Sequence, residues 1–201
     1  MDDPKVTKGQ IQVAPKINFS LPVAKESLGL TSEITNEVKN QTGTEFIRSA
    51  DPADSFYPRM TLLALTDIRA DLYPNSLIPL LFTSGQVIQR PEAQIAGFAR
   101  TNSGLMLLNL DLPLQIMQER ERLAQQLIPF RIGTAPSKHG DPHFDDPLHL
   151  TIGTHVTPEQ CEVLIQELLG KYANIPIKFE PLEMYSNDDW STNHPLEIVK
   201  F

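Results

Sequence analysis

Apolar and polar positions alternate with the period of a β-strand in some segments of the chain and recur with helical spacing in others. Alternation or a short apolar run predicts strands at residues 17–21, 61–65, 94–99, 105–110, 149–154, 175–184 and 196–201. Helical spacing predicts helices at residues 31–42, 77–82, 114–128 and 157–169. The order strand–helix–strand–strand occurs about twice. This repetition predicts an α+β fold with two pseudo-symmetric lobes of mostly antiparallel sheet and flanking helices around a central cleft.

Residues with known turn and capping preferences mark the ends of these elements. Thr157 followed by Pro158 is a strong helix start, and Gly170 is expected to end that helix. Thr31 or Ser32 is expected to cap the first helix, which Gly43 stops.

Three further patterns refine the prediction. Turn residues at 101–104 predict a hairpin between two strands. The nearly all-apolar run 61–65 is typical of a strand buried on both faces. The charged residues at 119–122 are expected to form a solvated face of their helix.

Two predicted strands begin after a proline and carry polar residues at positions i and i+2. His149 and Thr151 have this spacing in one strand, and Arg59 and Thr61 have it in the other. Residues i and i+2 of a strand project from the same face. If the two strands face each other, an imidazole, a guanidinium and two hydroxyls would share one pocket. Such a pocket is suited to an anion or a phosphate.

Composition narrows the possible functions. The chain has 201 residues and a formal net charge of −8, which argues against electrostatic binding of long nucleic acid but not against a short RNA end or a nucleotide. The single cysteine, Cys161, gives no sign of a disulfide framework. We find no secretory signal and no apolar run of membrane-spanning length. A cytoplasmic protein without membrane association is therefore expected.

The two motif segments resemble those of the 2H phosphoesterase superfamily, which includes 2′-5′ RNA ligase-like proteins and 2′,3′-cyclic nucleotide phosphodiesterases. That family carries two His-x-Thr/Ser motifs on pseudo-symmetric halves. Residues 147–152, PLHLTI, match the second motif, and residues 56–63, FYPRMTLL, match the surroundings of the first. The resemblance spans residues 17 to 201 and implies a metal-independent phosphodiesterase without a cofactor. Arg59 stands where the first histidine of the family is expected.

The resemblance implies a role for each motif residue. His149 would act as acid/base, Thr151 and Thr61 would hold phosphate oxygens, and Arg59 would stabilise the phosphate charge as an electrostatic clamp. Arginine stays protonated and cannot act as a base, so the family's two-histidine mechanism is not available from these positions. His149 with Arg59 as clamp is the first alternative, and replacement of the missing histidine by His143 is the second. The third is a pocket that binds a nucleotide or RNA phosphate without catalysis.

The remaining predictions concern the rim of the site and the chain ends. Tyr57, Tyr185 and Trp190 are candidates for contacts to a substrate base, although rim packing is the simpler interpretation for aromatic residues there. Residues 139–146 contain histidine and aspartate but match no established zinc spacing, so a solvated loop is favoured. Residues 1–15 are expected to form a flexible N-terminal arm before a single bilobal domain at 16–201. A scaffold protein that binds no ligand is the least favoured class.

Overall fold

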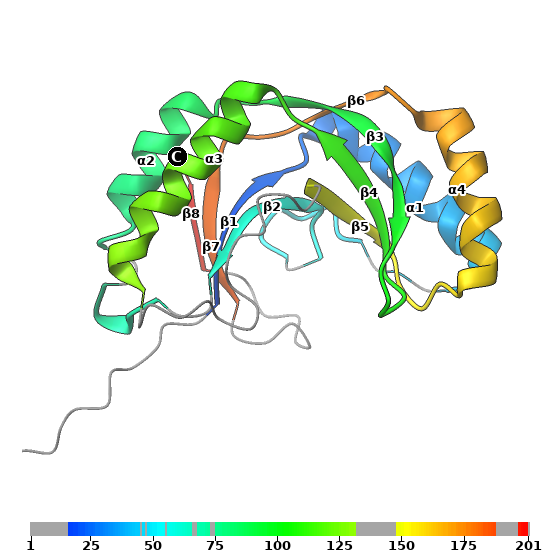
Figure 1. The fold of residues 1–201 in the computed structure, drawn as a ribbon, viewed down its shortest axis with the longest axis horizontal. Helices are drawn as coiled ribbons and strands as arrows, with labels where there is room; N and C mark the ends of the chain where they lie inside the picture. Colours follow the sequence, from blue (N-terminus) through cyan, green and yellow to red (C-terminus); the bar gives the residue numbers. More distant parts are fainter. Residues whose placement is uncertain are drawn as a thin grey trace, which may run out of the picture.

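The computed structural model consists of two four-stranded antiparallel sheets that curve around a central space, with two helices on the outside of each (Figure 1). The structure describes residues 16–200 except for 45, 47, 55, 66–67, 73–74, 132–147 and 188–196. The predicted α+β class with two lobes of mostly antiparallel sheet is confirmed. The proposed N-terminal arm at residues 1–15 lies outside the described residues.

Each sheet has its motif strand at one edge. The first sheet has the order β2 (Arg59–Leu65), β1 (Lys16–Pro22), β7 (Glu183–Asn187) and β8 (Glu197–Lys200). The second sheet has the order β5 (Leu148–Gly153), β4 (Met106–Asp111), β3 (Glu92–Arg100) and β6 (Pro176–Lys178). Strands β2 and β5 lie near each other, so the two motifs approach across the boundary between the lobes.

Two of the described helices pack in the lobe opposite to that of the strand that precedes each of them. Helix α1 (Leu28–Thr42) follows β1 of the first sheet but packs against β5 and against α4 (Pro158–Tyr172) in the second lobe. Helix α3 (Leu114–Leu127) follows β4 of the second sheet but packs against β2 and against α2 (Ile78–Val87) in the first. Short 3₁₀ helices complete the chain at Lys25–Ser27 (η1), Ala70–Leu72 (η2) and Ile128–Phe130 (η3).

The order of elements confirms the internal repetition. The predicted unit appears as β2–α2–β3–β4 and again as β5–α4–β6–β7. A strand and a helix also precede each motif strand, as β1–α1 before β2 and β4–α3 before β5. The motif strands therefore hold equivalent positions in the two lobes.

The pseudo-symmetry extends to single residues of the motif strands. From Arg59 and from His149 onward, the next four residues follow the same order of buried and partly exposed side chains. Each strand also carries one extra residue directly after its motif threonine, Leu62 in β2 and Ile152 in β5, where the register with the neighbouring strand shifts. Such β-bulges bend a strand and often lie beside active sites.

The bulge corrects one prediction about the run 61–65. The two consecutive buried side chains, Leu62 and Leu63, result from the extra residue and not from a strand covered on both faces. Thr61 and Ala64 are only partly buried.

Three of the predicted elements also differ in where they begin or end. Helix α1 begins at Leu28 instead of Thr31 or Ser32, and η1 leads directly into it. Helix α4 begins after Thr157 as predicted, with a capping box between Thr157 and Gln160, but it continues through Gly170 to Tyr172, because helical backbone geometry does not exclude glycine. The predicted strand 175–184 is split between β6 and β7, which belong to different sheets; Pro181 lies in the interruption and cannot donate to a strand ladder.

The charged residues of α3 also differ from the prediction. Glu119 and Arg120 are buried instead of solvated. Arg120 donates from Nε to the Leu62 carbonyl at 2.8 Å, and Glu119 pairs with Arg122. These contacts offset the cost of burying two charges.

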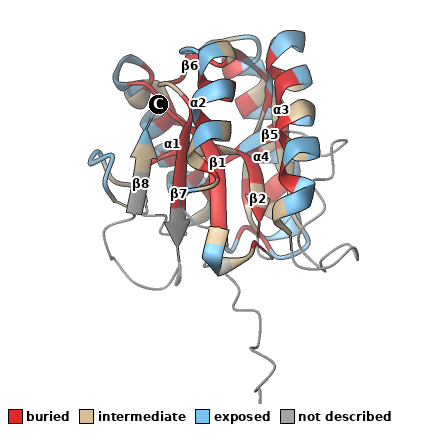
Figure 2. Cartoon of the chain, turned by 90° about the vertical axis from the view of Figure 1, so that its left-hand side faces the viewer, coloured by how far each residue is buried: buried red, intermediate tan, exposed pale blue. Residues whose placement is uncertain are grey.

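The core lies between the sheets and their helices. Figure 2 shows buried residues along β1 and β7 and exposed residues on the outer surface of the helices. Alternate β1 residues, among them Ile17, Phe19 and Leu21, belong to the hydrophobic core, whereas Asn18 and Ser20 occupy the intervening positions. Among the described helices, none has the length and apolar character needed to cross a bilayer.

Candidate active site

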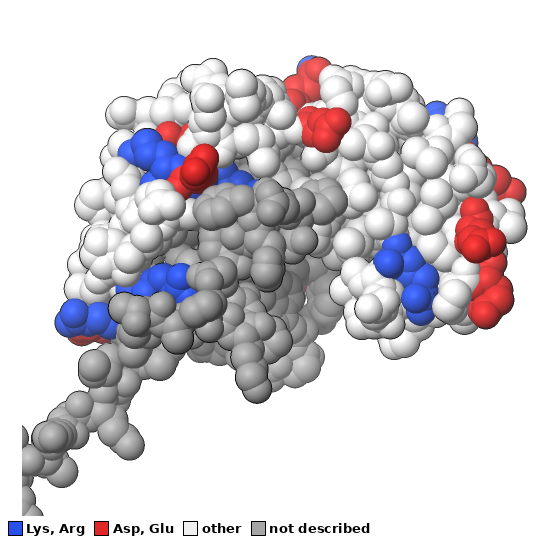
Figure 3. All heavy atoms as spheres, in the orientation of Figure 1, with Lys and Arg blue, Asp and Glu red and all other residues white. Residues whose placement is uncertain are grey.

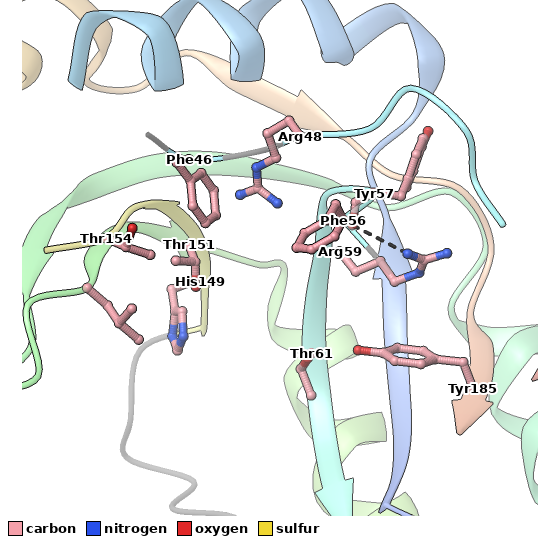
Figure 4. A pocket seen from close by; sticks show the side chains of 11 residues that line it. Phe46, Arg48, Phe56, Tyr57, Arg59, Thr61, His149, Thr151, Thr154 and Tyr185 are labelled. Carbon is pink, nitrogen blue, oxygen red and sulfur yellow. Dashed lines mark hydrogen bonds between the residues drawn. The ribbon is translucent and has the colours of Figure 1, made fainter. Parts of the chain in front are cut away.

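A cavity of about 500 Å³ lies where the two motif strands approach each other (Figure 4). The cavity is lined by residues from both sheets and from the segment that joins α1 to β2. The lining residues are Phe46, Arg48, Phe56, Tyr57, Arg59, Thr61, Leu105, His149, Thr151, Thr154 and Tyr185. The structure thus brings both motifs to one cavity.

Strand β5 supplies the second motif. His149 and Thr151 lie opposite Asn109 and Leu107 of β4, and both line the cavity, as the two-residue period of a strand predicts. His149 is exposed and Thr151 is half-buried, so a ligand can reach both. The apolar residues between and after them, Leu150 and Ile152, are fully buried and fix the strand to the core.

Strands β2 and β7 supply the opposite wall. Thr61 is half-buried on β2. Figure 4 shows the Tyr185 hydroxyl on β7 directed toward Thr61. Burial raises the pKa of Tyr185, while the Arg59 charge and the Thr61 hydroxyl oppose that rise.

Every guanidinium nitrogen of Arg59 is engaged by the protein. Nε donates to Glu183 Oε1 at 2.5 Å, Nη1 donates to the Asp54 carbonyl at 2.8 Å, and Nη2 donates to the Pro52 carbonyl. The side chain lies between the rings of Tyr57 and Tyr185, with its central carbon 5.3 Å and 5.2 Å from the two ring centroids. In Figure 4 it points away from His149.

This geometry favours a structural role for Arg59 over the predicted role as phosphate clamp. The Arg59 and Glu183 side chains are 4% and 1% exposed, so they form a buried ion pair. Burial raises the pKa of Glu183, and Arg59 opposes that effect. Binding a phosphate through Arg59 would require it to release contacts to the sheet and to the 52–54 carbonyls.

A second arginine, missed by the sequence analysis, occupies the cavity instead. Arg48 is half-buried, and its guanidinium lies over the Phe46 ring at 4.6 Å. Within the described part of the chain no carboxylate pairs with it. Burial lowers the pKa of Arg48 to about 10, which leaves it charged at neutral pH. A partly desolvated cation that no described carboxylate neutralises is suited to an anionic ligand.

Arg48, Phe46 and Phe56 belong to the irregular segment between α1 and β2. No periodicity marks such a segment, so its side chains could not be assigned to the site. The one available signal was an arginine and two phenylalanines placed just before a motif strand.

The other predicted site residues divide into two groups. Tyr57 lines the cavity, but its hydroxyl donates to the Val23 carbonyl at 2.6 Å. His143 and Trp190 lie outside the described residues, as does the segment 139–146. No group of three or more potential metal-ligating side chains occurs among the residues that the structure describes. Cys161 is buried in α4, away from the cavity lining.

Comparison with known proteins identifies the fold. No protein-family model and no curated protein matches the sequence. Solved structures match over nearly the whole chain. Usb1 of Kluyveromyces marxianus with uridine monophosphate is 8% identical with a TM-score of 0.53, covering 93% of this chain and 98% of that one. A second structure of that Usb1 is 9% identical, with a TM-score of 0.50 and coverages of 92% and 98%. A phosphoesterase crystal structure is 11% identical, with a TM-score of 0.50 and coverages of 94% and 96%.

These matches cover both lobes and the cleft between them. The fold is therefore that of these Usb1 and phosphoesterase structures, and the predicted resemblance is confirmed at the level of the fold. At such low identity the roles of His149, Thr151 and Thr61 stay predictions.

Proposed function

We propose that this protein is a metal-independent phosphodiesterase that acts on 2′,3′-cyclic or 2′-5′-linked nucleotide or RNA ends. One observation carries the proposal: His149 and Thr151 share a cavity with Thr61 and with Arg48, a cation that no described carboxylate neutralises. This set combines a group that exchanges protons near neutral pH with donors for phosphate oxygens.

Each residue has a distinct role in this proposal. His149 accepts the proton of the attacking water, because an imidazole is a base at neutral pH. The hydroxyls of Thr151 and Thr61 donate hydrogen bonds to phosphate oxygens from opposite sides. Arg48 neutralises the charge that develops on those oxygens. Phe46 and Phe56 offer ring faces on which a nucleobase can stack.

The size and charge of the molecule support a small ligand. A cavity of about 500 Å³ matches the size of typical small-molecule sites. On the face shown in Figure 3, Lys and Arg side chains are scattered among Asp, Glu and uncharged ones, and the whole chain carries a net charge of −8. A local cation inside an acidic protein favours a nucleotide or an RNA end over long duplex nucleic acid. The Usb1 structure of similar fold was solved with uridine monophosphate.

The test is hydrolysis of 2′,3′-cyclic nucleotides and 2′-5′-linked dinucleotides in the presence of EDTA. We expect turnover by the wild type and a decrease of roughly 10²–10⁴-fold in His149→Asn, which is the contribution of a general base. The matched control is His155→Asn. His155 is exposed, does not line the cavity and has φ of 58°, a conformation that asparagine tolerates. This variant should keep wild-type turnover.

Two results would contradict the proposal. Turnover that EDTA abolishes would indicate a metal-dependent reaction. Nucleotide binding without turnover would indicate a receptor built on the same cavity.

A further inference from the structure

The proposed reaction leaves one proton without a source. When a phosphodiester bond to ribose breaks, the departing sugar oxygen needs a proton, because a sugar alkoxide is strongly basic. Arg59, at the position of the family's first histidine, cannot supply it, since arginine does not deprotonate in proteins and its nitrogens already donate to Glu183, Asp54 and Pro52. Among the described residues, the same wall of the cavity offers other groups that can donate a proton.

Two phenols border that wall, and their hydroxyls differ in direction. The Tyr57 hydroxyl donates to the Val23 carbonyl at 2.6 Å and is thereby occupied. The Tyr185 hydroxyl is instead directed toward Thr61, itself a predicted phosphate ligand (Figure 4). Tyr185 is 4% exposed, so its ring is fixed while its hydroxyl end reaches the cavity lining.

We propose that Tyr185 is the general acid of this site and that Arg59 is its positioning residue, the two together replacing the missing histidine. The inference rests on the proposed phosphodiesterase function and adds a catalytic residue to it. Tyr185 and His149 lie on opposite walls, so one can protonate the leaving oxygen while the other deprotonates the water on the far side of the phosphorus (Figure 4).

The step balances for a 2′,3′-cyclic phosphate. The oxygen of water forms a bond to phosphorus, and its proton passes to His149. One P–O bond to the ribose breaks, and the electron pair stays on the ribose oxygen. That oxygen takes the proton of Tyr185, which becomes a phenolate. Proton exchange with solvent then restores neutral His149 and the phenol, so the net reaction consumes one water.

The surroundings of Tyr185 suit both of its protonation states. Burial raises its pKa, so the phenol is protonated at neutral pH and ready to donate. Once the proton has left, the Arg59 guanidinium over the ring at 5.2 Å and the nearby Thr61 hydroxyl stabilise the phenolate, since both oppose the rise in the pKa of Tyr185. Arg59 on β2 thus supplies a fixed charge beside the Tyr185 phenol on β7.

The experiment compares two substrates that differ in their need for leaving-group protonation. One is a 2′,3′-cyclic nucleotide. The other is the p-nitrophenyl ester of a 2′-deoxynucleoside 3′-phosphate, whose leaving group departs as a stable anion. Tyr185→Phe should lose roughly 10²-fold or more in kcat on the cyclic substrate and only a few-fold on the ester. The alkaline limb of the wild-type pH–rate profile should also disappear in this variant on the cyclic substrate.

The matched control is Tyr172→Phe. Tyr172 is 2% exposed on α4, and its hydroxyl donates to Glu33 and Glu37 far from the cavity lining. It should keep the wild-type ratio between the substrates. Equal losses on both substrates in Tyr185→Phe would overturn the acid assignment alone. A wild type inactive on both would overturn the phosphodiesterase function, and the assignment with it.

Discussion

At the scale of single residues, two arginines beside one cavity have opposite surroundings. Arg59 is surrounded by protein acceptors, whereas Arg48 contacts only the Phe46 ring among the interactions of the described residues. A structural arginine contributes to stability through its partners. An arginine kept for a ligand costs stability until the ligand arrives, because burial disfavours its charge.

Replacement of Arg48 by methionine tests this distinction. Arg48→Met should weaken binding of a nucleoside 3′-phosphate by about 10–100-fold, since a hydrogen bond to a charged group is worth about 1.5–3 kcal/mol. It should also raise the melting temperature of the ligand-free protein, because the buried charge is removed. Calorimetric titration and differential scanning calorimetry measure the two effects.

The control for Arg48→Met is Arg69→Met. Arg69 forms an ion pair with Asp71, and the two side chains are 44% and 59% exposed. Loss of this pair should change neither ligand binding nor stability appreciably. A loss of stability in Arg48→Met would show that Arg48 is structural and would remove the phosphate-binding role.

The sequence predicted the second motif better than the first, for a physical reason. His149 and Thr151 lie in a regular strand, where the two-residue period determines which side chains share a face. Arg59 obeys the same period, but its long side chain turns to carbonyls of the preceding segment, and strand periodicity contains no information about that choice. Arg48 belongs to no periodic element at all.

At the scale of elements, Arg59 fixes the segment before β2 to the first sheet. It joins the carbonyls of Pro52 and Asp54 to Glu183 on β7. The same segment carries Phe56 and Tyr57 into the cavity lining. The shape of this wall therefore depends on a buried ion pair, which is costly to break from one side.

Arg59→Met should lower the free energy of unfolding by about 3–5 kcal/mol at pH 7, because it leaves the Glu183 carboxylate buried without its partner. The loss should become smaller as the pH falls from 7 toward 5. Burial raises the pKa of Glu183 in the folded state, and removal of Arg59 raises it further, whereas the unfolded carboxyl keeps its ordinary pKa. The folded protein then binds a proton that the unfolded chain does not, so acid stabilises it.

Urea unfolding at several pH values measures this effect. Arg59→Met combined with Glu183→Gln provides the control, since it removes the titrating group and should abolish the difference in pH dependence. A loss in the free energy of unfolding of Arg59→Met that becomes larger as the pH falls would contradict this explanation.

Arg59→His should also be less stable than the wild type and should gain no activity, because an imidazole cannot reach all the partners of the guanidinium.

The elements themselves were largely predictable, and the errors have local causes. Apolar periodicity located both motif strands and the four helices of the described chain, since burial of one face creates that pattern. The bulges at Leu62 and Ile152 break the alternation by one residue, so a strand with one open face looked buried on both. Residues 175–184 looked like one strand because pattern alone does not show which sheet a strand joins.

At the scale of the whole molecule, the chain joins the two lobes repeatedly. Helices α1 and α3 each cross from the sheet of their preceding strand to cover the other sheet. The Ala24 amide donates to the Lys178 carbonyl at 2.9 Å, and the Glu180 amide donates to the Pro22 carbonyl at 2.8 Å, which ties the end of β1 to the end of β6. Neither lobe can bury its sheet without a helix from the other half.

This exchange predicts that the lobes unfold together. Phe19→Ala in the first sheet and Leu108→Ala in the second remove fully buried side chains, and each should lower the free energy of unfolding by about 2–5 kcal/mol. Each should shift one common transition, with the urea m-value unchanged, because the surface exposed on unfolding stays the same. Far-UV circular dichroism and intrinsic fluorescence should give coincident curves.

The control is Val163→Ala, at a 62% exposed position of α4, which should leave the unfolding curve unchanged. Two separate transitions in either core variant would show that each lobe is stable alone. In that case the cavity could open by movement between lobes, whereas a single transition indicates that the two walls of the cavity belong to one cooperative unit with a shared core.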